Sequence, residues 1–542
     1  MALFKSTHPN FRRLTLPDAL DTPPACFRYD HKSALDRKLD LYSERAFYYS
    51  YYETVIRAPT TLDVYQQLLN DSSVEHPTPI NALSRFNIYP ELVLGLFYRL
   101  FGTYLPISAH DLMMAVSFIL AGIQWAGFAY LAVIVTENPL NGILAMALCC
   151  MHADTMTRAD MLMLRENFAL PFFWWQVAAL LRYLGDVDKT WRSTFVGTTI
   201  AMLCSWQFTP MLLLLELVAV FAAYCTNVAL PAHVILAVDA MSEAAVIGVL
   251  MMLGNSMIAG SLWVLALATT WLVLRYLPSD LNTLHNIMQG AIIACATLAI
   301  KKLLSLTFNR DDSHIFTILE ALLAEDYDLL TALYVCSAAY IPITPSQLSA
   351  YWDSGLVPLA ALGATIVILM ALLYQYVGQH TPLMETTIAT ALCLVLICLG
   401  LGIQRHENLK SHALTDTNMR ALVKYLRKAV PANHTILSDP VLSSSIKLLT
   451  RHHIVLHPHA ESASVHQRYQ DVFQIVAPIS EQQAANLMEK YDAQWMVLAQ
   501  GPCELTCPSG MPLSYYATQP SHLNNYRSVP APTVMLSGHG VS

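Results

Sequence analysis

Long apolar segments, separated by short polar ones, dominate the middle of this chain. A helix needs about 20 residues to cross a bilayer. Apolar segments that approach or exceed this length occupy residues 112–135, 208–230, 259–277, 284–305, 356–377 and 384–403. Shorter or interrupted apolar segments occupy residues 139–152, 167–183, 194–207 and 242–258. The pattern therefore predicts a polytopic α-helical membrane protein with roughly ten spans.

Polar segments flank and divide the apolar ones. We expect an N-terminal region at residues 1–110, a transmembrane domain at 111–403 with a lumenal loop at 306–352, and a tail at 404–542. Residues 1–40 contain no apolar segment that could act as a cleavable signal peptide. Insertion into the membrane is therefore expected to use an internal span.

The tail at residues 404–542 is long enough to fold on its own. Apolar runs at residues 454–456 and 495–498 are typical of strands, and helical periods cover 441–450 and 480–491. The tail is therefore predicted to be a small α/β domain.

The composition supports the membrane class and excludes one kind of partner. Of the 542 residues, 55% are hydrophobic and only 13% are charged, which is too apolar for a soluble chain of this size. The formal net charge is -8, and no basic cluster is interleaved with aromatic residues. We expect a lipid bilayer, and no nucleic acid, as a partner.

Two features of the polar regions bear on their location. Asn-x-Ser/Thr glycosylation acceptors occur at residues 70–72 and 433–435, which agrees with a lumenal N-terminal region and a lumenal tail. Cys503 and Cys507 lie in the tail and would form a disulfide in the lumen, with a metal site as the alternative.

Residues 157–168 place two arginines and two acidic residues between apolar segments. Ionisable groups at membrane depth are costly, so they line a cavity, pair with one another or meet a charged ligand. The alternative to a binding role for Arg165 and Glu166 is an ion pair that only fixes helix packing.

An aromatic run flanked by carboxylates, SERAFYYSYYE, occupies residues 43–53. Such a run can stack against a sugar or an indole while a carboxylate handles a proton. The alternative is that the tyrosines anchor an amphipathic segment at the membrane interface.

The aromatic run opens a series of motifs. Together with residues 81–91 (NALSRFNIYPE), residues 48–54 (YYSYYET) resemble the first lumenal loop of the protein C-mannosyltransferases of the dumpy-nineteen type. Further matches follow in the family's order at His152, residues 157–158, 164–172, 206–208, 311–315 and 457–459, Tyr469 and residues 472–475.

The resemblance implies a fold of the GT-C glycosyltransferase kind, with a multi-helix membrane domain and a lumenal C-terminal domain. It implies an endoplasmic reticulum enzyme with a lumenal active site. That enzyme would transfer mannose from dolichyl-phosphate mannose to C2 of tryptophan in Trp-x-x-Trp sequons of secretory and membrane proteins.

The implied reaction assigns a role to Glu44. Attack by the indole carbon on the sugar leaves a cationic ring that must lose its C2 proton, so a carboxylate is needed nearby. Glu44 lies where the family carries an acid, and pairing with Arg45 or capping of a helix is its alternative role. Tyr48 and Tyr51 are expected to contact the acceptor or the lipid.

The donor carries a phosphate, whose charge needs cations. Arg165 is the first candidate because a guanidinium binds phosphate in a bidentate fork. Glu166 would orient Arg165 or a neighbouring helix end. Arg158 and His314 are further candidates for contact with the phosphate or the sugar.

Two further motifs indicate a functional role less specifically. Trp206 and Gln207 are expected to contact the lipid-linked sugar or the acceptor, although an aromatic residue at the interface is the alternative. His457 and His459 have no third ligand that would complete a zinc site. We therefore expect no metal and no other cofactor.

The sequence also departs from the family. Residues 1–40 lack the apolar span that should precede the first lumenal loop, so we expect a truncated N-terminus. Glu53 replaces a basic residue, and residues 159–163 and 460–462 differ from the family pattern, which puts acceptor preference in doubt. The alternative functions are another transferase of this fold, acting on hydroxyl groups or glycans, and a catalytically silent membrane scaffold.

Overall fold

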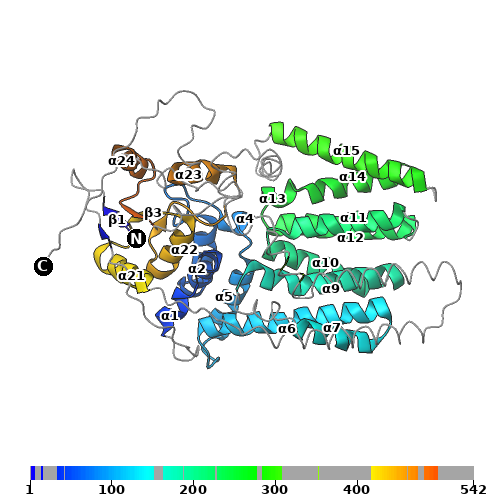
Figure 1. Cartoon of the computed structure of the whole chain (residues 1–542), viewed down its shortest axis with the longest axis horizontal. Coiled ribbons are helices and arrows are strands. Elements are labelled where there is room, and N and C mark those ends of the chain that lie inside the picture. Colours follow the sequence, from blue (N-terminus) through cyan, green and yellow to red (C-terminus); the bar gives the residue numbers. More distant parts are fainter. Residues whose placement is uncertain are drawn as a thin grey trace. The chain divides into compact units, whose positions relative to one another are not determined.

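The protein is described here from a computed structural model of the whole chain (Figure 1). The structure describes residues 2–5, 14–15, 33–41, 43–151, 163–186, 188–225, 229–277, 283–307, 349, 352, 417–459, 462–473 and 481–498. The predictions that lie outside these residues concern the spans at 356–377 and 384–403, and Arg158, His314, Cys503 and Cys507.

The contacts divide the chain into two compact units. Unit 1 comprises Met1–Leu96, Leu304–Pro342 and Ser411–Ser542, and unit 2 comprises Phe97–Leu303 and Ile343–Lys410. The division expected from the sequence kept the N-terminal region and the tail apart. The contacts instead group most of both segments in unit 1.

Unit 1 contains a five-stranded sheet in the order β2-β1-β5-β3-β4. Its strands are β1 (Ala2–Lys5), β2 (Leu14–Thr15), β3 (Thr435–Ser438), β4 (His453–Ile454) and β5 (Trp495–Leu498). β3 runs parallel to β4 and β5, and β1 pairs with β5 in the antiparallel direction. The pairing of β1 with β5 explains why the two ends of the chain belong to one unit.

Unit 1 also contains helices. They are α1 (Ala34–Leu39), α2 (Glu44–Arg57), α3 (Thr61–Leu69), α4 (Ala82–Arg85), most of α5 (Tyr89–Phe101), α21 (Thr417–Ala429), α22 (Pro440–Thr450), α23 (Ala463–Phe473) and α24 (Glu481–Lys490). α22 contacts β3 and β4, and α2 packs against α22, which joins the N-terminal region to the tail. The strand and helices predicted at residues 495–498, 441–450 and 480–491 are confirmed at β5, α22 and α24, whereas the strand predicted at 454–456 shares only Ile454 with β4.

Local sequence explains where two of these helices begin. The Thr60 side chain accepts a hydrogen bond from the Asp63 backbone, and the Asp63 side chain accepts one from the Thr60 backbone. This capping box starts α3. Asp439 accepts hydrogen bonds from the first turn of α22, and Pro440 occupies its first position, where its missing N–H costs nothing.

Unit 2 is built from helices that run alongside one another (Figure 1). They are α6 (Ala109–Thr136), α7 (Pro139–Met151), α9 (Arg165–Asp186), α10 (Lys189–Ser205), α11 (Thr209–Cys225), α12 (Pro231–Met251), α13 (Ser256–Ala259), α14 (Leu262–Tyr276) and α15 (Thr283–Thr307).

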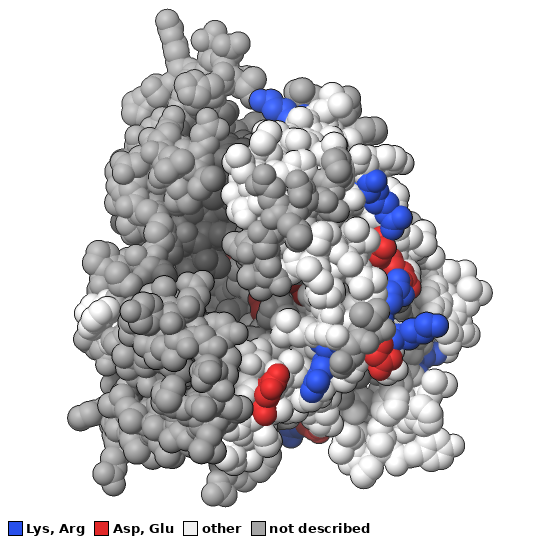
Figure 2. Space-filling model, turned by 90° about the vertical axis from the view of Figure 1, so that its right-hand side faces the viewer, with Lys and Arg blue, Asp and Glu red and all other residues white. Residues whose placement is uncertain are grey.

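The apolar character of unit 2 confirms the membrane class. Among the described residues, Ala109–Thr136, Pro231–Met251 and Thr283–Leu304 are long and apolar enough to cross a membrane, and α11 and α14 are shorter apolar helices. In the view of Figure 2, most of the described surface carries no charged side chain, and the charged residues gather in one band.

One predicted span is displaced from its position in the structure. The apolar pattern placed it at residues 242–258, whereas α12 runs over Pro231–Met251. Asp239 interrupts the pattern before this predicted start and Glu243 lies within the predicted span, but each forms an ion pair with an arginine of another helix. The helix therefore continues through both acidic residues, since paired charges are tolerated there.

Candidate functional site

Glu44 is the first residue of α2. Its side chain is half-buried, and among the described residues it takes part in no hydrogen bond or ion pair. The alternative role for Glu44, pairing with Arg45, is therefore not seen in the structure. A carboxylate in the first turn is stabilised by the positive end of the helix dipole. The carboxylate of Glu44 is partly accessible at the start of the aromatic helix.

The aromatic side chains that follow Glu44 are buried. The exposed fractions are at most 3% for Phe47, Tyr48, Tyr49, Tyr51 and Tyr52. These rings pack inside unit 1, so the interpretation of the run as a membrane-interface anchor is wrong. Their burial instead gives α2 a rigid position, and with it the carboxylate of Glu44.

Two motifs that are far apart in the sequence meet on this helix. The Phe47 ring stacks on the His457 ring at a centroid distance of 5.3 Å, and the Tyr48 ring meets His459 edge-on at 5.2 Å. Tyr48 is only 2% exposed, so the structure places it beneath the histidine loop and not on a surface that an acceptor could reach. The aromatic run and the histidine pair therefore form one packed cluster.

His457 is held by a buried ionic network that the sequence did not reveal. Glu75 Oε1 lies 3.0 Å from His457 Nε2 and accepts a hydrogen bond of 2.9 Å from Arg85 Nη2. The backbone N–H of His459 donates to His457 Nδ1, so the proton of a neutral imidazole lies on Nε2 and is donated to Glu75. No pattern in the sequence marks Glu75, whose role depends on the position of the tail.

Glu75 and His457 differ in charge within this network. Burial acts to raise the pKa of Glu75, but the hydrogen bond from His457 and the charges of Arg85 and Arg468 outweigh it and hold the pKa at about 2. Burial lowers the pKa of His457 below its usual range, and Glu75 opposes that shift only in part. At neutral pH, Glu75 is a carboxylate and His457 is a neutral donor.

The backbone at Glu75 shows that this network carries strain. Its φ of 55° lies in the left-handed region, which side chains other than glycine rarely adopt. Such a conformation costs about 1–3 kcal/mol and persists where the surroundings fix it. The hydrogen bonds to Arg85 and His457 supply that restraint.

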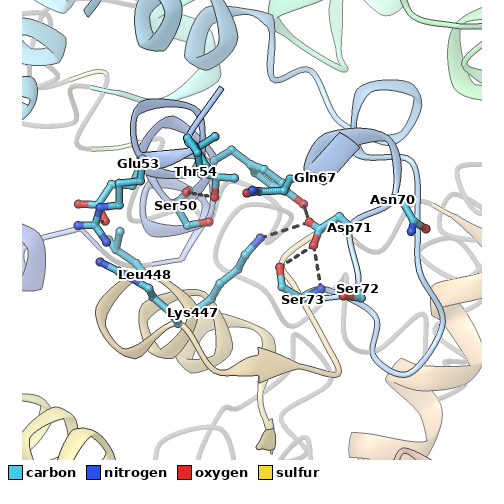
Figure 3. A pocket seen from close by; sticks show the side chains of 15 residues that line it. Ser50, Glu53, Thr54, Gln67, Asn70, Asp71, Ser72, Ser73, Lys447 and Leu448 are labelled. Carbon is cyan, nitrogen blue, oxygen red and sulfur yellow. Dashed lines mark hydrogen bonds and ion pairs between the residues drawn. The ribbon is translucent and has the colours of Figure 1, made fainter. Parts of the chain in front are cut away.

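A cavity of about 330 Å³ lies on another side of α2 (Figure 3). It is lined by Ser50, Tyr51, Glu53, Thr54, Arg57, Ala58, Pro59, Gln67, Asn70, Asp71, Ser72, Ser73, Lys447, Leu448 and Arg451. Of the predicted site residues that the structure describes, only Tyr51 lines it. The acceptor asparagine at position 70 also borders it and is exposed.

Lys447 extends from α22 toward Asp71 within this cavity (Figure 3). Its ammonium nitrogen lies 3.7 Å from Asp71 Oδ2 and 3.8 Å from the centre of the Tyr51 ring. Burial lowers the pKa of Lys447, and Asp71 opposes the shift. Sequence reasoning missed Lys447 because helical periodicity does not distinguish a buried lysine from an exposed one.

Arg165 and Glu166 begin α9 in unit 2. Arg165 is only 1% exposed, and its Cζ lies 5.0 Å from the centre of the Phe168 ring. Glu166 is half-buried in the same turn. A guanidinium at a helix N-terminus combines two sources of positive potential, which is the electrostatic arrangement that binds anions.

Trp206 and Gln207 connect α10 to α11. Trp206 ends α10, and its ring meets Phe208 edge-on at 5.7 Å. Both predicted contact residues are half-buried, so they remain partly accessible. Within the described part of the chain, no group of three or more His, Cys, Asp or Glu residues could hold a metal ion.

The apolar helices of unit 2 and the α/β fold of unit 1 define a membrane protein that also carries a folded polar unit. The sequence profile of the Dpy19 family, described as Q-cell neuroblast polarisation, matches residues 25–382 and 373–511. The chain belongs to the Dpy19 family.

Relatives from nematodes and mammals have similar sequences. The chain is 28% identical over 369 residues to C-mannosyltransferase dpy-19 of Caenorhabditis briggsae, covering 62% of this chain and 54% of the relative. It is 27% identical over 351 residues to protein C-mannosyl-transferase DPY19L1 of Homo sapiens, covering 58% of this chain and 52% of the relative. These matches span about half the length of the relatives.

Proposed function

We propose that this chain is a protein C-mannosyltransferase with a GT-C fold in the endoplasmic reticulum membrane. It would transfer mannose from dolichyl-phosphate mannose to C2 of tryptophan in Trp-x-x-Trp sequons of secretory or membrane proteins, on the lumenal side. Family membership and the names of its relatives support this proposal. The single observation that carries it is the partly accessible Glu44 at the start of a helix whose aromatic rings pack on the histidine loop.

Glu44 would act as the base of the reaction. As C2 of the indole forms a bond to the anomeric carbon, the bond from that carbon to the phosphate oxygen breaks and the ring becomes cationic. Glu44 would stabilise the cation and then accept the C2 proton, which restores the aromatic indole. Its place in the first helical turn puts it beside the positive end of the helix dipole.

Arg165 would bind the phosphate of the donor in unit 2. The leaving dolichyl phosphate gains negative charge as the sugar departs, and a guanidinium beside a helix N-terminus stabilises that charge. Phe168 packs against the guanidinium and restricts its position. Glu166, and Arg158 and His314 outside the described residues, remain predicted contacts in this proposal.

A peptide assay tests the proposal. Membranes that contain the protein are incubated with dolichyl-phosphate mannose and a Trp-x-x-Trp peptide, and fragmentation mass spectrometry locates any added hexose. Hexose on the tryptophan ring supports the proposal. Hexose found only on Ser or Thr would favour the hydroxyl-directed transferase, and no transfer to any acceptor would favour the silent scaffold.

The variant Glu44→Gln tests the base directly. The matched control is Glu489→Gln, because Glu489 is an exposed carboxylate of α24 in the same unit. Transfer by Glu489→Gln at the wild-type rate, together with its loss in Glu44→Gln, supports the assignment. An unchanged rate in Glu44→Gln would remove Glu44 from the mechanism without disproving the activity.

A further inference from the structure

The cavity between α2, α22 and the loop after α3 is rich in hydrogen-bond donors. The buried ammonium of Lys447 makes no hydrogen bond among the described residues, because Asp71 Oδ2 is 3.7 Å away. The ammonium faces Asp71 and lies over the Tyr51 ring, so it has electrostatic contacts but no hydrogen-bond acceptor in the described part of the chain, on a side chain that is only 6% exposed. A buried ammonium without hydrogen bonds is costly, which favours a ligand that accepts them.

The Asp71 carboxylate in the cavity already accepts several hydrogen bonds. Asp71 Oδ1 accepts hydrogen bonds from the backbone N–H and the hydroxyl of Ser73, at 2.8 and 2.6 Å. Asp71 Oδ2 accepts one from the Tyr51 hydroxyl at 2.8 Å. The carboxylate therefore has little capacity left for the donors of a ligand.

The second carboxylate of the cavity is also paired. Glu53 forms ion pairs with Lys38 and with Arg57, whose Nη2 lies 2.9 Å from Glu53 Oε2. Arg451 is exposed at the cavity's edge, and among the described residues its side chain has no ionic partner. The three cations that line the cavity thus exceed its two carboxylates, and Lys447 and Arg451 hold the donors that remain.

We propose that this cavity is a binding site for the phosphate group of a small water-soluble ligand, with Lys447 and Arg451 as its cationic contacts. A ligand that carries acceptor oxygens matches the charged donors of Lys447 and Arg451, which make no hydrogen bond to a carboxylate among the described residues. The volume of about 330 Å³ lies at the lower end of the usual range for small-molecule sites, about 300–1,000 Å³. A phosphomonoester fits better than a bare ion.

The site is separate from the proposed reaction. It lies within unit 1 and contains neither Glu44 nor Arg165, so it does not depend on the function proposed above. Its link to α2 is structural, because Ser50 and Tyr51 line the cavity while Phe47 and Tyr48 on the same helix pack on the histidine loop. A ligand bound there would stabilise α2.

Binding is measured on the full chain purified in detergent. The probes are inorganic phosphate and glycerol 3-phosphate, with potassium chloride at equal ionic strength and neutral mannose as controls. We expect both phosphate probes to raise the thermal unfolding midpoint and to give heat in a calorimetric titration. A tighter fit of glycerol 3-phosphate would identify a phosphomonoester as the ligand class, and equal affinities would identify free phosphate.

Three variants test the contacts. Lys447→Met and Arg451→Ala should each weaken phosphate binding about tenfold or more, because each removes a charged donor. Lys447→Arg keeps the charge and should retain most of the affinity. The matched control Lys424→Met removes an exposed lysine of α21 outside the cavity and should bind phosphate as the wild type does.

Folding of each variant is checked by circular dichroism, and Arg451→Ala remains a test if Lys447→Met does not fold, since Arg451 is exposed. Wild-type affinity in a folded Lys447→Met and in Arg451→Ala would overturn the proposal. So would an equal response to mannose, which would indicate a sugar site, or an equal response to chloride, which would indicate a general effect of salt.

Discussion

Two glutamates of unit 1 differ in how deeply their carboxylates are buried and in how many partners they have. Glu44 is half-buried at the first turn of α2 and makes no hydrogen bond or ion pair within the described residues. Glu75 is 2% exposed and is held by Arg85 and His457 in a left-handed backbone conformation. A carboxylate that must exchange a proton with a substrate has to be reachable. A carboxylate that joins two segments has to be enclosed. Glu75 is enclosed in this way, whereas Glu44 has the accessibility that the proposed base requires.

Replacing Glu44 should have the largest effect, and only on activity. We expect Glu44→Gln to slow C-mannosylation of a Trp-x-x-Trp peptide by about 10²–10⁴-fold, the usual contribution of a general base. Peptide turnover and the thermal unfolding midpoint are measured together. A midpoint that falls as steeply as the activity would mean that Glu44, like Glu75, is structural.

Replacing Glu75 should mainly affect stability. Glu75→Ala leaves Arg85 and His457 without their buried partner, so we expect unit 1 to lose about 3–5 kcal/mol of unfolding free energy. Glu44→Ala should lose no more than about 1 kcal/mol, the value of a charge at a helix end. Denaturant unfolding followed by tryptophan fluorescence compares the two. Similar losses of unfolding free energy in Glu75→Ala and Glu44→Ala would contradict the structural role assigned to Glu75 alone.

The depressed pKa of Glu75 makes the stability of unit 1 sensitive to acid. The pKa is about 2 in the folded protein, against an ordinary value of 4.5. The stabilisation is therefore fully present above pH 4.5 and is lost as the pH falls toward 2, and the full difference corresponds to about 3 kcal/mol. The Gln side chain of Glu75→Gln cannot titrate, so the difference in unfolding free energy between this variant and the wild type should shrink as the pH falls from 4.5 toward 2. Unfolding measured at several pH values gives this difference. A difference that is constant with pH would contradict the ionic role.

The smallest expected effect concerns the hydrogen bond that links α2 to the cavity. Tyr51→Phe removes the hydroxyl that donates to Asp71, while Lys447 and Ser73 stay in place. We expect a loss of about 1.5 kcal/mol of unfolding free energy, at the low end for a hydrogen bond to a charged group. Tyr98→Phe is the control, because the Tyr98 hydroxyl donates a hydrogen bond to the Ile107 carbonyl at an exposed position. Equal losses of unfolding free energy in Tyr51→Phe and Tyr98→Phe would show that burial of the hydrogen bond adds no stability.

The transmembrane helices and the helices and strands of the tail could be predicted because their signals are local. Hydrophobic runs mark α6, α11, α14 and α15, and short periods mark α22 and β5. The prediction placed one span at 242–258 instead of Pro231–Met251 because Asp239 interrupts the apolar pattern, although Asp239 and Glu243 are both paired in the structure. Their partner arginines lie on other helices and cannot be seen from a window of sequence.

The candidate site was only partly predictable. Glu44, Arg165 and the histidine pair follow from motifs, and the structure gives each a definite environment. Glu75 and Lys447 were missed, because nothing near them in the sequence shows that one faces His457 and the other faces Asp71. The role of Tyr48 differs from the prediction for the same reason, since its burial comes from the tail.

The sequence alone determined that the chain enters a membrane, where most of its apolar helices lie, and to which family its motifs belong. The first two properties follow from hydrophobicity and periodicity within a few turns of chain, and the third follows from the motifs. Only the tertiary structure decided which carboxylate is enclosed. Glu75 and His457 are 382 positions apart, and the packing of α2 on α22 brings their segments together. Contacts between segments so distant depend on the fold as a whole.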